Sequence, residues 1–454
     1  MNAVTATSAH KQPDSEQDYI TNTASDHPTS GGSTPTAHYY NGSTYFTYLG
    51  GCDDYFDPFA MSYDHATGTV NGPVHIGDNP LADVEDGHSV PAIIVDDDGY
   101  IHVIYGGHGH YRGRQTHAVS RTPEDISSWE ILDNIDPETT YPSFIKKRDG
   151  TLYLFYRAGN HRDDWVYVTS TDNGRTFSDP TAFASAGNRR HGLYGHDVSY
   201  EDSWYLSFYK GRNGSIHVTG LYHACHDSYS YPLENMPEPR HGYNRFGTYY
   251  LRMNPDETWE NAAGESIDVP FDKTLADEKL RLYDTGPDYV LAAPRMGYHD
   301  VGGSNSNTAH GVYDTPHLVF PTRNGMSGGF TFARWGGDSW EIHEEGTPWG
   351  PMFMKSPQDI RIYQSDRVAW GGPVNDSEPD SGEYRSTDGG ETWERVGDVQ
   401  NDQLHQQTVA YNYHNDAKVM ALNYSDDRAK NAQRIYLYGD SGFVRPDENP
   451  TCPE

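Results

Sequence analysis

The fold is decided by a pattern that occurs three times in the first half of the chain: Asp98-Gly99-Tyr100-Ile101-His102-Val103, Asp149-Gly150-Thr151-Leu152-Tyr153-Leu154 and Asn213-Gly214-Ser215-Ile216-His217-Val218. In each copy, an Asp-Gly or Asn-Gly pair typical of a tight turn leads into a short segment typical of a β-strand. The turn glycines are 51 and then 64 residues apart. A repeat of this length predicts a β-propeller, in which each blade is one small sheet.

A second motif recurs, as Ser170-Thr171-Asp172-Asn173-Gly174-Arg175-Thr176-Phe177 and as Ser386-Thr387-Asp388-Gly389-Gly390-Glu391-Thr392-Trp393. Its pattern, Ser-x-Asp-x-Gly-x-Thr-aromatic, resembles the Asp-box turn of sialidase-like BNR-repeat propellers. The two motifs together predict an all-β fold: one seven-bladed β-propeller over residues 38–454, with blades of roughly 50–60 residues. A β-sandwich or a parallel β-helix is the alternative. Residues 1–37 are polar and predict a disordered N-terminal arm.

The composition limits the function classes. Of the 454 residues, 33 are basic and 66 acidic, which gives a net charge of −33. Acidity spread along a chain with few lysines indicates adaptation to high salt, where self-repulsion is screened, and it argues against nucleic-acid binding. Three cysteines are too few for a disulfide framework. No apolar run is long enough to span a membrane, and no signal peptide is evident. We therefore expect a secreted protein if a leader was removed or another export route serves it, and a cytoplasmic protein otherwise.

Four polar residues flank two successive predicted hairpins. His88 precedes and His108 follows one strand–turn–strand segment, and Tyr141 and Arg157 flank the next. Because a hairpin folds back on itself, the residues at its two ends lie close together. Imidazole is the side chain best suited to moving protons near neutral pH. We therefore expect a His, His, Tyr, Arg site on neighbouring blades, with ordinary loop hydrogen bonds and propeller packing as the alternative interpretation.

Residues 80–230 resemble the propeller-type ulvan lyases. The resemblance rests on Asp86-Gly87-His88-Ser89-Val90-Pro91, Gly106-Gly107-His108, Thr140-Tyr141-Pro142 and Leu154-Phe155-Tyr156-Arg157. It implies a seven-bladed propeller that cleaves an acidic, sulfated algal polysaccharide by β-elimination. It implies further that His88 and His108 are active-site histidines, Tyr141 a catalytic tyrosine and Arg157 the carboxylate-binding arginine. Another family tyrosine lies in the following blade; Tyr194 is our choice for it, and Tyr200 is the alternative.

The chemistry of β-elimination independently calls for these residue types. A base must remove the C5 proton of a uronate, an acid must protonate the leaving oxygen at C4, and an arginine fork can neutralise the carboxylate. Tyrosine serves as an acid at neutral pH and as a base only beside a cation that lowers its pKa. The sequence leaves open which of His88 and Tyr141 is the base.

Basic residues concentrate in the same part of this base-poor chain: Arg112, Arg114, Arg157, Arg162, Arg189, Arg190, Lys210 and Arg212. A basic mouth on an acidic body would capture a polyanion. We therefore expect Arg112, Arg189, Arg190 and Arg212 to bind an acidic polysaccharide, and we favour a monomer.

A cluster of soft ligands follows in Leu221-Tyr222-His223-Ala224-Cys225-His226. Strand alternation puts His223 and Cys225 on one face, and one Cys with three His suits tetrahedral zinc. The resemblance also implies a structural zinc held by His and Cys. We expect His223, Cys225, His226 and His241 to bind it, with His191 or His196 as alternatives to His226, and we expect no organic cofactor.

Two other functions remain compatible with a propeller. A sialidase-type hydrolase would need an arginine triad, which this chain does not offer convincingly. A non-catalytic glycan-binding propeller could use its many Tyr and Trp residues as stacking platforms. Product chemistry separates them: a lyase creates a C4=C5 double bond that absorbs in the ultraviolet, a hydrolase creates reducing ends without it, and a binding module creates neither.

Overall fold

The structure is a computed structural model. It describes residues 18–25, 29, 32–50, 56–109, 114–186, 190–192, 199–225, 245–286, 290, 292–300, 310–322, 329–344, 346–364, 382–397, 404–423 and 433–450. For residues 190–192, 199–201, 225, 405 and 423 it describes the backbone alone. Across these ranges the fold is all-β, and no helix is long and apolar enough to cross a membrane.

The described strands form five hydrogen-bonded sheets. In spatial order, the largest contains β1 (Thr21–Ala24), β30 (Gln433–Gly439), β29 (Ala417–Asn423), β28 (Leu404–His414), β2 (Ala37–Tyr40), β3 (Ser43–Leu49), β4 (Pro58–Asp64) and β5 (Val70–His75), with β31 (Gly442–Phe443) paired to β30. The second contains β6 (Ala92–Val95), β7 (Ile101–Tyr105), β8 (Thr116–Thr122) and β9 (Asp125–Leu132). The third contains β10 (Thr140–Lys146), β11 (Leu152–Arg157), β12 (Trp165–Ser170) and β13 (Thr181–Ala184).

The fourth sheet contains β14 (Arg190–Gly192), β15 (Ser199–Lys210), β16 (Ile216–Cys225), β17 (Arg245–Met253) and β18 (Trp259–Glu260), with β19 (Arg281–Tyr283) paired to β17. The fifth contains β23 (Trp340–His343), β22 (Phe330–Trp335), β21 (His317–Pro321), β20 (Arg295–His299), β24 (Met352–Met354), β25 (Ile360–Gln364), β26 (Gly382–Ser386) and β27 (Glu394–Gly397). Short helical turns occur at η1 (Ala82–Val84), α1 (Lys273–Leu275) and η3 (Ala276–Leu280).

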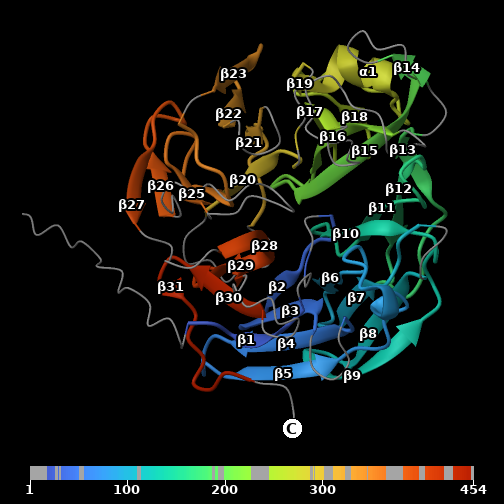
Figure 1. The fold of residues 1–454 in the computed structure, drawn as a ribbon, viewed down its shortest axis with the longest axis vertical. Coiled ribbons are helices and arrows are strands. Elements are labelled where there is room, and N and C mark those ends of the chain that lie inside the picture. Colours follow the sequence, from blue (N-terminus) through green and yellow to red (C-terminus); the bar gives the residue numbers. More distant parts are fainter. Residues whose placement is uncertain are drawn as a thin grey trace, which may run out of the picture.

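The sheets follow one another around a common centre, in chain order (Figure 1). Within each four-strand unit the neighbours are antiparallel, whereas the two strand pairings that join one unit to the next are parallel: β2 pairs with β28, and β20 with β24. Isolated parallel bridges, Thr34 to Ser143 and Gly211 to Val312, link further units. The first strands of successive units therefore line the centre side by side, and their corresponding ends face the same way.

The N-terminal segment closes this ring, so the expectation of a disordered arm over residues 1–37 is wrong for part of its length. β1 pairs antiparallel with β30 near the C-terminus. Ile20 and Ala24 are fully buried, and Thr23 shares a hydrogen bond of 2.6 Å with the Tyr48 hydroxyl. The polar composition concealed a strand because its threonines are buried and hydrogen-bonded rather than solvated. Residues 1–17 lie outside the described ranges, as do residues 26–28, 30 and 31.

The repeated turns have the predicted conformation. Gly99, Gly150 and Gly214 have φ values of 88°, 87° and 91°, a region that only glycine enters without strain. Both Asp-box turns share one hydrogen-bond pattern. In the first, the Asp172 carboxylate accepts from the backbone and side chain of Thr176, and in the second, Asp388 accepts from Thr392 in the same way. These turns join the two outermost strands of their units, so their role is structural.

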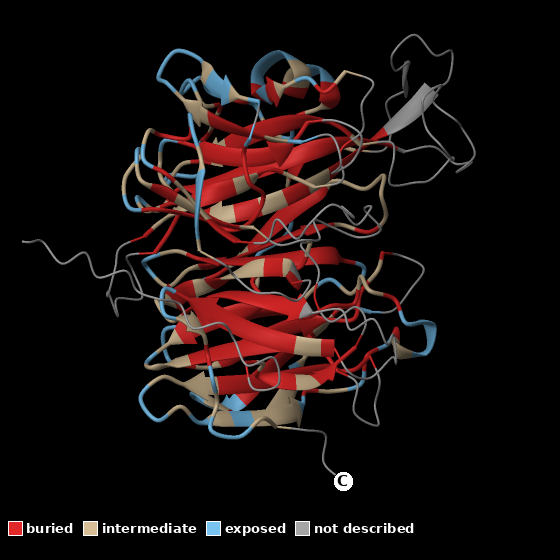
Figure 2. Cartoon of the chain, turned by 60° about the vertical axis from the view of Figure 1, so that its left-hand side comes forward, coloured by how far each residue is buried: buried red, intermediate tan, exposed pale blue. Residues whose placement is uncertain are grey.

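Burial falls from the centre outward (Figure 2). Every residue of β6 is buried, whereas the fourth strand of the same unit, β9, is mostly intermediate or exposed. Between neighbouring sheets the core is aromatic: the rings of Phe155 and Phe208 stack with centroids 4.3 Å apart, and Phe183 stacks on Trp259 at 5.2 Å. Such pairs contribute about 0.5–1.5 kcal/mol each beyond the area they bury. The packed layers hold the inner strand ends rigidly where the site forms.

Candidate active site

His88 and His108 meet at one end of the β6–β7 hairpin, as the spacing predicts. Their rings stack with centroids 3.7 Å apart and planes 17° from parallel. A single carboxylate holds both: Asp86 lies 2.6 Å from Nδ1 of His88 through one oxygen and 2.6 Å from Nδ1 of His108 through the other. Because an ionised carboxylate only accepts, each Nδ1 must carry its proton. Both Nε2 atoms are then left with a lone pair.

The shifts in pKa within the Asp86–His88 pair favour an ionised carboxylate beside a neutral imidazole. Burial alone would raise the pKa of Asp86, but the hydrogen bonds from His108 and His88 outweigh it and hold that pKa well below its usual range. Burial lowers the pKa of His88; the bond to Asp86 opposes this effect, while the charges of His108 and Arg157 add to it. Near neutral pH, His88 is therefore a proton acceptor.

Tyr141 projects from the start of β10 in a strained conformation. Its φ of 59° is rare for a bulky residue, and the register of β10 against β11 shifts between Thr140 and Ser143. The ring packs so closely on Gly32 that a methyl group there would come within 2.2 Å of it. Its centroid lies 5.6 Å from that of His88. Strain of this kind persists where surrounding contacts enforce it, often at functional sites.

Arg157 ends β11 opposite Thr140, which places it beside Tyr141 as the hairpin predicts. Its guanidinium carbon lies 5.0 Å from the Tyr141 ring centroid. The side chain is fully buried, and its three guanidinium nitrogens have no hydrogen-bond partner among the residues that the structure describes. Burying a cation without an anion costs desolvation free energy that no ion pair offsets. The guanidinium of Arg157 is therefore available to an anion that enters the site.

Tyr205 and Arg245 complete the cluster, and sequence reasoning missed both. Tyr205 lies within β15, with its ring centroid 5.8 Å from that of Tyr141 and 4.0 Å from the guanidinium carbon of Arg245. Burial would raise the pKa of Tyr205, but Arg245 and then Arg157 outweigh it and lower that pKa. In Tyr141, burial and the neighbouring Tyr205 outweigh both arginines, and the pKa is raised. The two phenols therefore differ in acidity.

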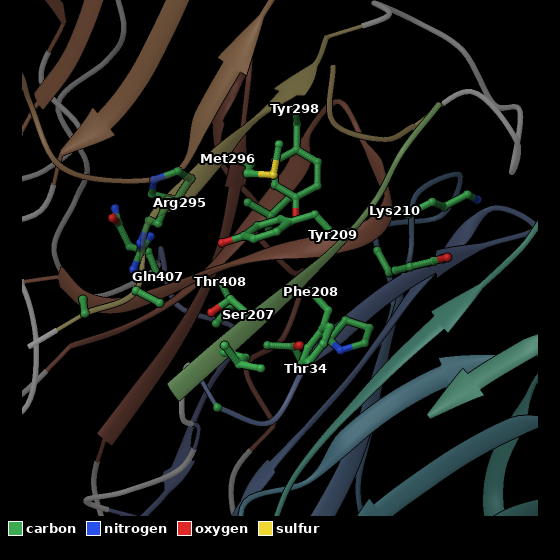
Figure 3. A pocket seen from close by; sticks show the side chains of 18 of the residues that line it. Thr34, Ser207, Phe208, Tyr209, Lys210, Arg295, Met296, Tyr298, Gln407 and Thr408 are labelled. Carbon is green, nitrogen blue, oxygen red and sulfur yellow. The ribbon is translucent and has the colours of Figure 1, made fainter. Parts of the chain in front are cut away.

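These residues open onto a central cavity of about 390 Å³. His88, Tyr141, Tyr205 and Arg245 line it, while Arg157 lies behind the two tyrosine rings. β15 runs along its wall from Tyr205 to Lys210 (Figure 3). The N-terminal segment contributes Gly32, Thr34 and Pro35. Among the described lining residues there is no Asp or Glu, although the chain contains 66 acidic residues. The cavity therefore suits an anionic ligand.

Not every predicted residue joins this site. Arg212 follows β15 and accepts a hydrogen bond at its carbonyl from Arg148, in the turn at the other end of the β10–β11 hairpin from Tyr141 and Arg157. It therefore lies at the opposite end of the inner strands, and the structure does not bring it to the predicted basic mouth. Arg112, Arg189 and Tyr194 lie outside the described residues, and Arg190 and Tyr200 are described by their backbone only.

The predicted zinc ligands are covered only in part. His223 is fully buried on β16, and its ring centroid lies 5.8 Å from that of His161 and 5.4 Å from that of Tyr205. Cys225 is two residues further on the same strand and has a described backbone only, while His226 and His241 lie outside the described ranges. Of the four expected ligands, the structure therefore places the side chain of His223 alone, beside Tyr205 of the tyrosine–arginine group.

Comparison with known proteins extends beyond the site. Residues 60–302 match a family described as BNR repeat-containing family member. An ulvan lyase of Nonlabens ulvanivorans is 30% identical over 446 residues, which cover 90% of this chain and 86% of that protein. An ulvan lyase designated PL25, from Pseudoalteromonas sp. (strain PLSV), is 32% identical over 368 residues, covering 74% of this chain and 70% of that protein.

A solved structure agrees with these sequence relatives. It is described as a polysaccharide lyase, PL25 ulvan lyase, bound to -[GlcA(1-4)Rha3S]-, and it matches with a TM-score of 0.75 at 27% identity over 94% of this chain and 96% of that one. Together with the family match, this likeness defines the class as a BNR-repeat polysaccharide lyase. Within that class, identity of 30% over nine-tenths of the sequence is decisive: the chain belongs to the ulvan lyase family.

Proposed function

We propose that this protein cleaves ulvan, a sulfated uronate polysaccharide of extracellular type, by β-elimination in the central cavity. The observation that carries the proposal is the single carboxylate, Asp86, that orients two stacked imidazoles beside Tyr141. That arrangement presents a proton acceptor and a proton donor to one ligand. The absence of Asp and Glu among the described residues that line the cavity supports an anionic substrate.

His88 acts as the base. Its Nδ1 proton is engaged by Asp86, and its lowered pKa keeps Nε2 unprotonated near neutral pH. Nε2 removes the proton from C5 of the uronate, and the electron pair of that C–H bond becomes the C4=C5 double bond as the C4–O bond breaks. Asp86 then stabilises the imidazolium that forms. His108, held by the same carboxylate, supports the orientation of His88 and presents a second acceptor.

Tyr141 acts as the acid. Its raised pKa keeps the phenol protonated over the working pH range, so that it can give its proton to the departing C4 oxygen. A positioned proton transfer of this kind contributes typically about 10²–10⁴-fold to the rate. The lowered pKa of Tyr205 makes its phenol the more acidic of the two, and its contacts with both guanidinium groups suit it to positioning the two arginines.

Arg157 and Arg245 neutralise the substrate carboxylate. Loss of the C5 proton would otherwise create a dianion, and positive charge in a water-poor cavity stabilises it most. Arg245 lines the cavity, and immediately behind Tyr141 and Tyr205 Arg157 adds a charge that no described residue pairs with. Arg112, Arg189 and Arg190 remain proposed contacts for the rest of the polymer.

The direct test is ultraviolet absorbance on incubation with ulvan. The wild-type protein should produce an unsaturated uronate without any added reagent, and His88→Ala and Tyr141→Phe should each abolish most of the signal. A matched control is His75→Ala, since His75 is bound to Asp57 on a different surface and does not line the cavity. Reducing ends without absorbance would instead establish a hydrolase.

We propose that the ring is a seven-bladed propeller. The two composite sheets each divide at their parallel junction, β2 with β28 and β20 with β24, into two four-strand units. With the other three sheets, the described strands then group into seven units, of which the last combines β28, β29 and β30 with β1. The pairing of the first strand, β1, with β30 near the C-terminus supports a complete ring. Electron-density maps from a crystal of the protein would test the number.

We also propose a structural zinc held by His223, Cys225, His226 and His241. His223 and Cys225 are alternate residues of β16 and so share one face, and imidazole with thiolate is a donor set that zinc prefers. Since His223 lies beside Tyr205, the ion would brace the end of β16 against the site and take no part in proton transfer.

A further inference from the structure

Arg295 is a cation on the cavity wall whose side chain has no ion-pair partner among the described residues, and it comes from a different sheet from the His–Tyr–Arg group. It begins β20 and lines the cavity together with Trp349 and Gln407. Its guanidinium carbon lies 4.8 Å from the Trp349 ring centroid. Figure 3 shows Arg295 beside Gln407 on one wall. The backbone of Arg295 pairs with Val319, but its guanidinium forms no hydrogen bond or ion pair with any residue within the described ranges.

Among the residues that the structure describes, no carboxylate compensates the charge of Arg295. The groups that act on its charge are the phenols of Tyr209, Tyr438 and Tyr298, and burial lowers its pKa. Arginines on outer parts of the sheets are paired instead: Arg252 with Glu260, Arg361 with Glu383 and Arg385 with Asp359. In a chain of net charge −33, a carboxylate partner would be easy to supply. A partly desolvated cation without one loses hydration and gains no pair in return.

We propose that Arg295 forms a second oxyanion subsite, which binds an additional anionic group of the polysaccharide while Arg157 and Arg245 neutralise the uronate that is cleaved. Sulfate esters and uronate carboxylates present the same paired oxygens to a guanidinium fork, so either group fits. The indole of Trp349 lies against the fork and restricts its rotation, which lowers the entropy cost of binding. This inference rests on the proposed function, since it requires an anionic polymer in the cavity.

The experiment measures kcat and KM for ulvan by ultraviolet absorbance in wild type and in Arg295→Gln. Loss of a charge-assisted pair should raise KM by about 10- to 100-fold. We expect kcat to stay within about twofold because Arg295 makes no contact with the reacting atoms. The matched control is Arg175→Gln: Arg175 lies on an Asp-box turn, 3.6 Å from Glu130 and outside the cavity, and its loss removes the same charge. Arg175→Gln should leave KM unchanged.

The same measurements on chemically desulfated ulvan identify the ligand. If wild type and Arg295→Gln become equal on the desulfated polymer, the group is a sulfate ester; if the difference persists, it is a second carboxylate. Equal KM values on both polymers, with Arg295→Gln folded by circular dichroism, would overturn the inference. Should that variant fail to fold, Arg295→Lys keeps the charge but loses the fork, and an unchanged KM there overturns it equally. A wild-type protein that produces no absorbance would instead refute the proposed function.

Discussion

Replacing Asp86 by Asn should change the tautomer of one active-site histidine without changing the size of the side chain. The carboxylate accepts an Nδ1 proton from each imidazole, whereas an amide has one accepting oxygen and one donating nitrogen. The backbone N–H of His88 also donates to the oxygen nearest His88, at 3.0 Å. We therefore expect the amide oxygen to remain beside His88 and the amide nitrogen to face His108.

The consequences differ for the two rings. His108 must accept at Nδ1 and carry its proton on Nε2, which turns an acceptor into a donor. His88 keeps its Nε2 lone pair but loses the negative charge that favours its protonated form, so its pKa falls further. Because the base must be neutral to act, activity is lost as the pH falls through that pKa. An adjacent opposite charge shifts a pKa by about 1–3 units, so the acid limb of the profile should move down by at least about 1 pH unit.

The rate should fall as well. The imidazolium formed in the transition state loses a charge-assisted hydrogen bond of about 1.5–3 kcal/mol, which predicts a drop in kcat of about 10- to 150-fold. Ultraviolet initial rates across the pH range give the profile, and long-range ¹H–¹⁵N NMR of the imidazoles gives the tautomers. Asp57→Asn is the matched control, since Asp57 holds His75 at 3.0 Å away from the cavity. An acid limb that does not move, or a His88 that carries its proton on Nε2 in the wild type, would refute the reasoning.

Three further predictions concern the arginine, the metal and the salt. Arg157→Lys should stay folded yet lower kcat/KM about 100-fold, because an ammonium lacks the planar fork; near-normal turnover of ulvan would show that only the charge matters. Cys225→Ser should remove bound zinc and lower the melting temperature, with little change in rate per folded molecule; elemental analysis that finds no metal in the wild type would contradict this. The melting temperature should rise from low to molar salt, because the Debye length falls from about 30 Å to about 3 Å and screens the −33 charge; a flat or falling curve would assign the acidity another cause.

The sequence by itself determined the features that depend on neighbours along the chain. The Asp-Gly and Asn-Gly pairs demand turns with positive φ, and the structure has them at Gly99, Gly150 and Gly214. Hairpin ends must meet, so His88 with His108 and Tyr141 with Arg157 could be paired from their spacing. The short-range chemistry of turns and alternating strands carries this information, because it acts over a few residues.

Only the tertiary structure decided which distant elements complete the site. Tyr205 lies inside a strand of twelve residues, and its register against Arg157 and Arg245 depends on how neighbouring sheets pack. The contact of Gly32 with Tyr141 and the position of Arg212 at the far end of the inner strands depend on sheet packing in the same way. From its sequence alone, β1 resembles a polar tail, and only its pairing with β30 shows that it is a strand. Contacts between units depend on how the whole ring closes. Closure involves all the sheets together, so a local sequence pattern cannot predict it.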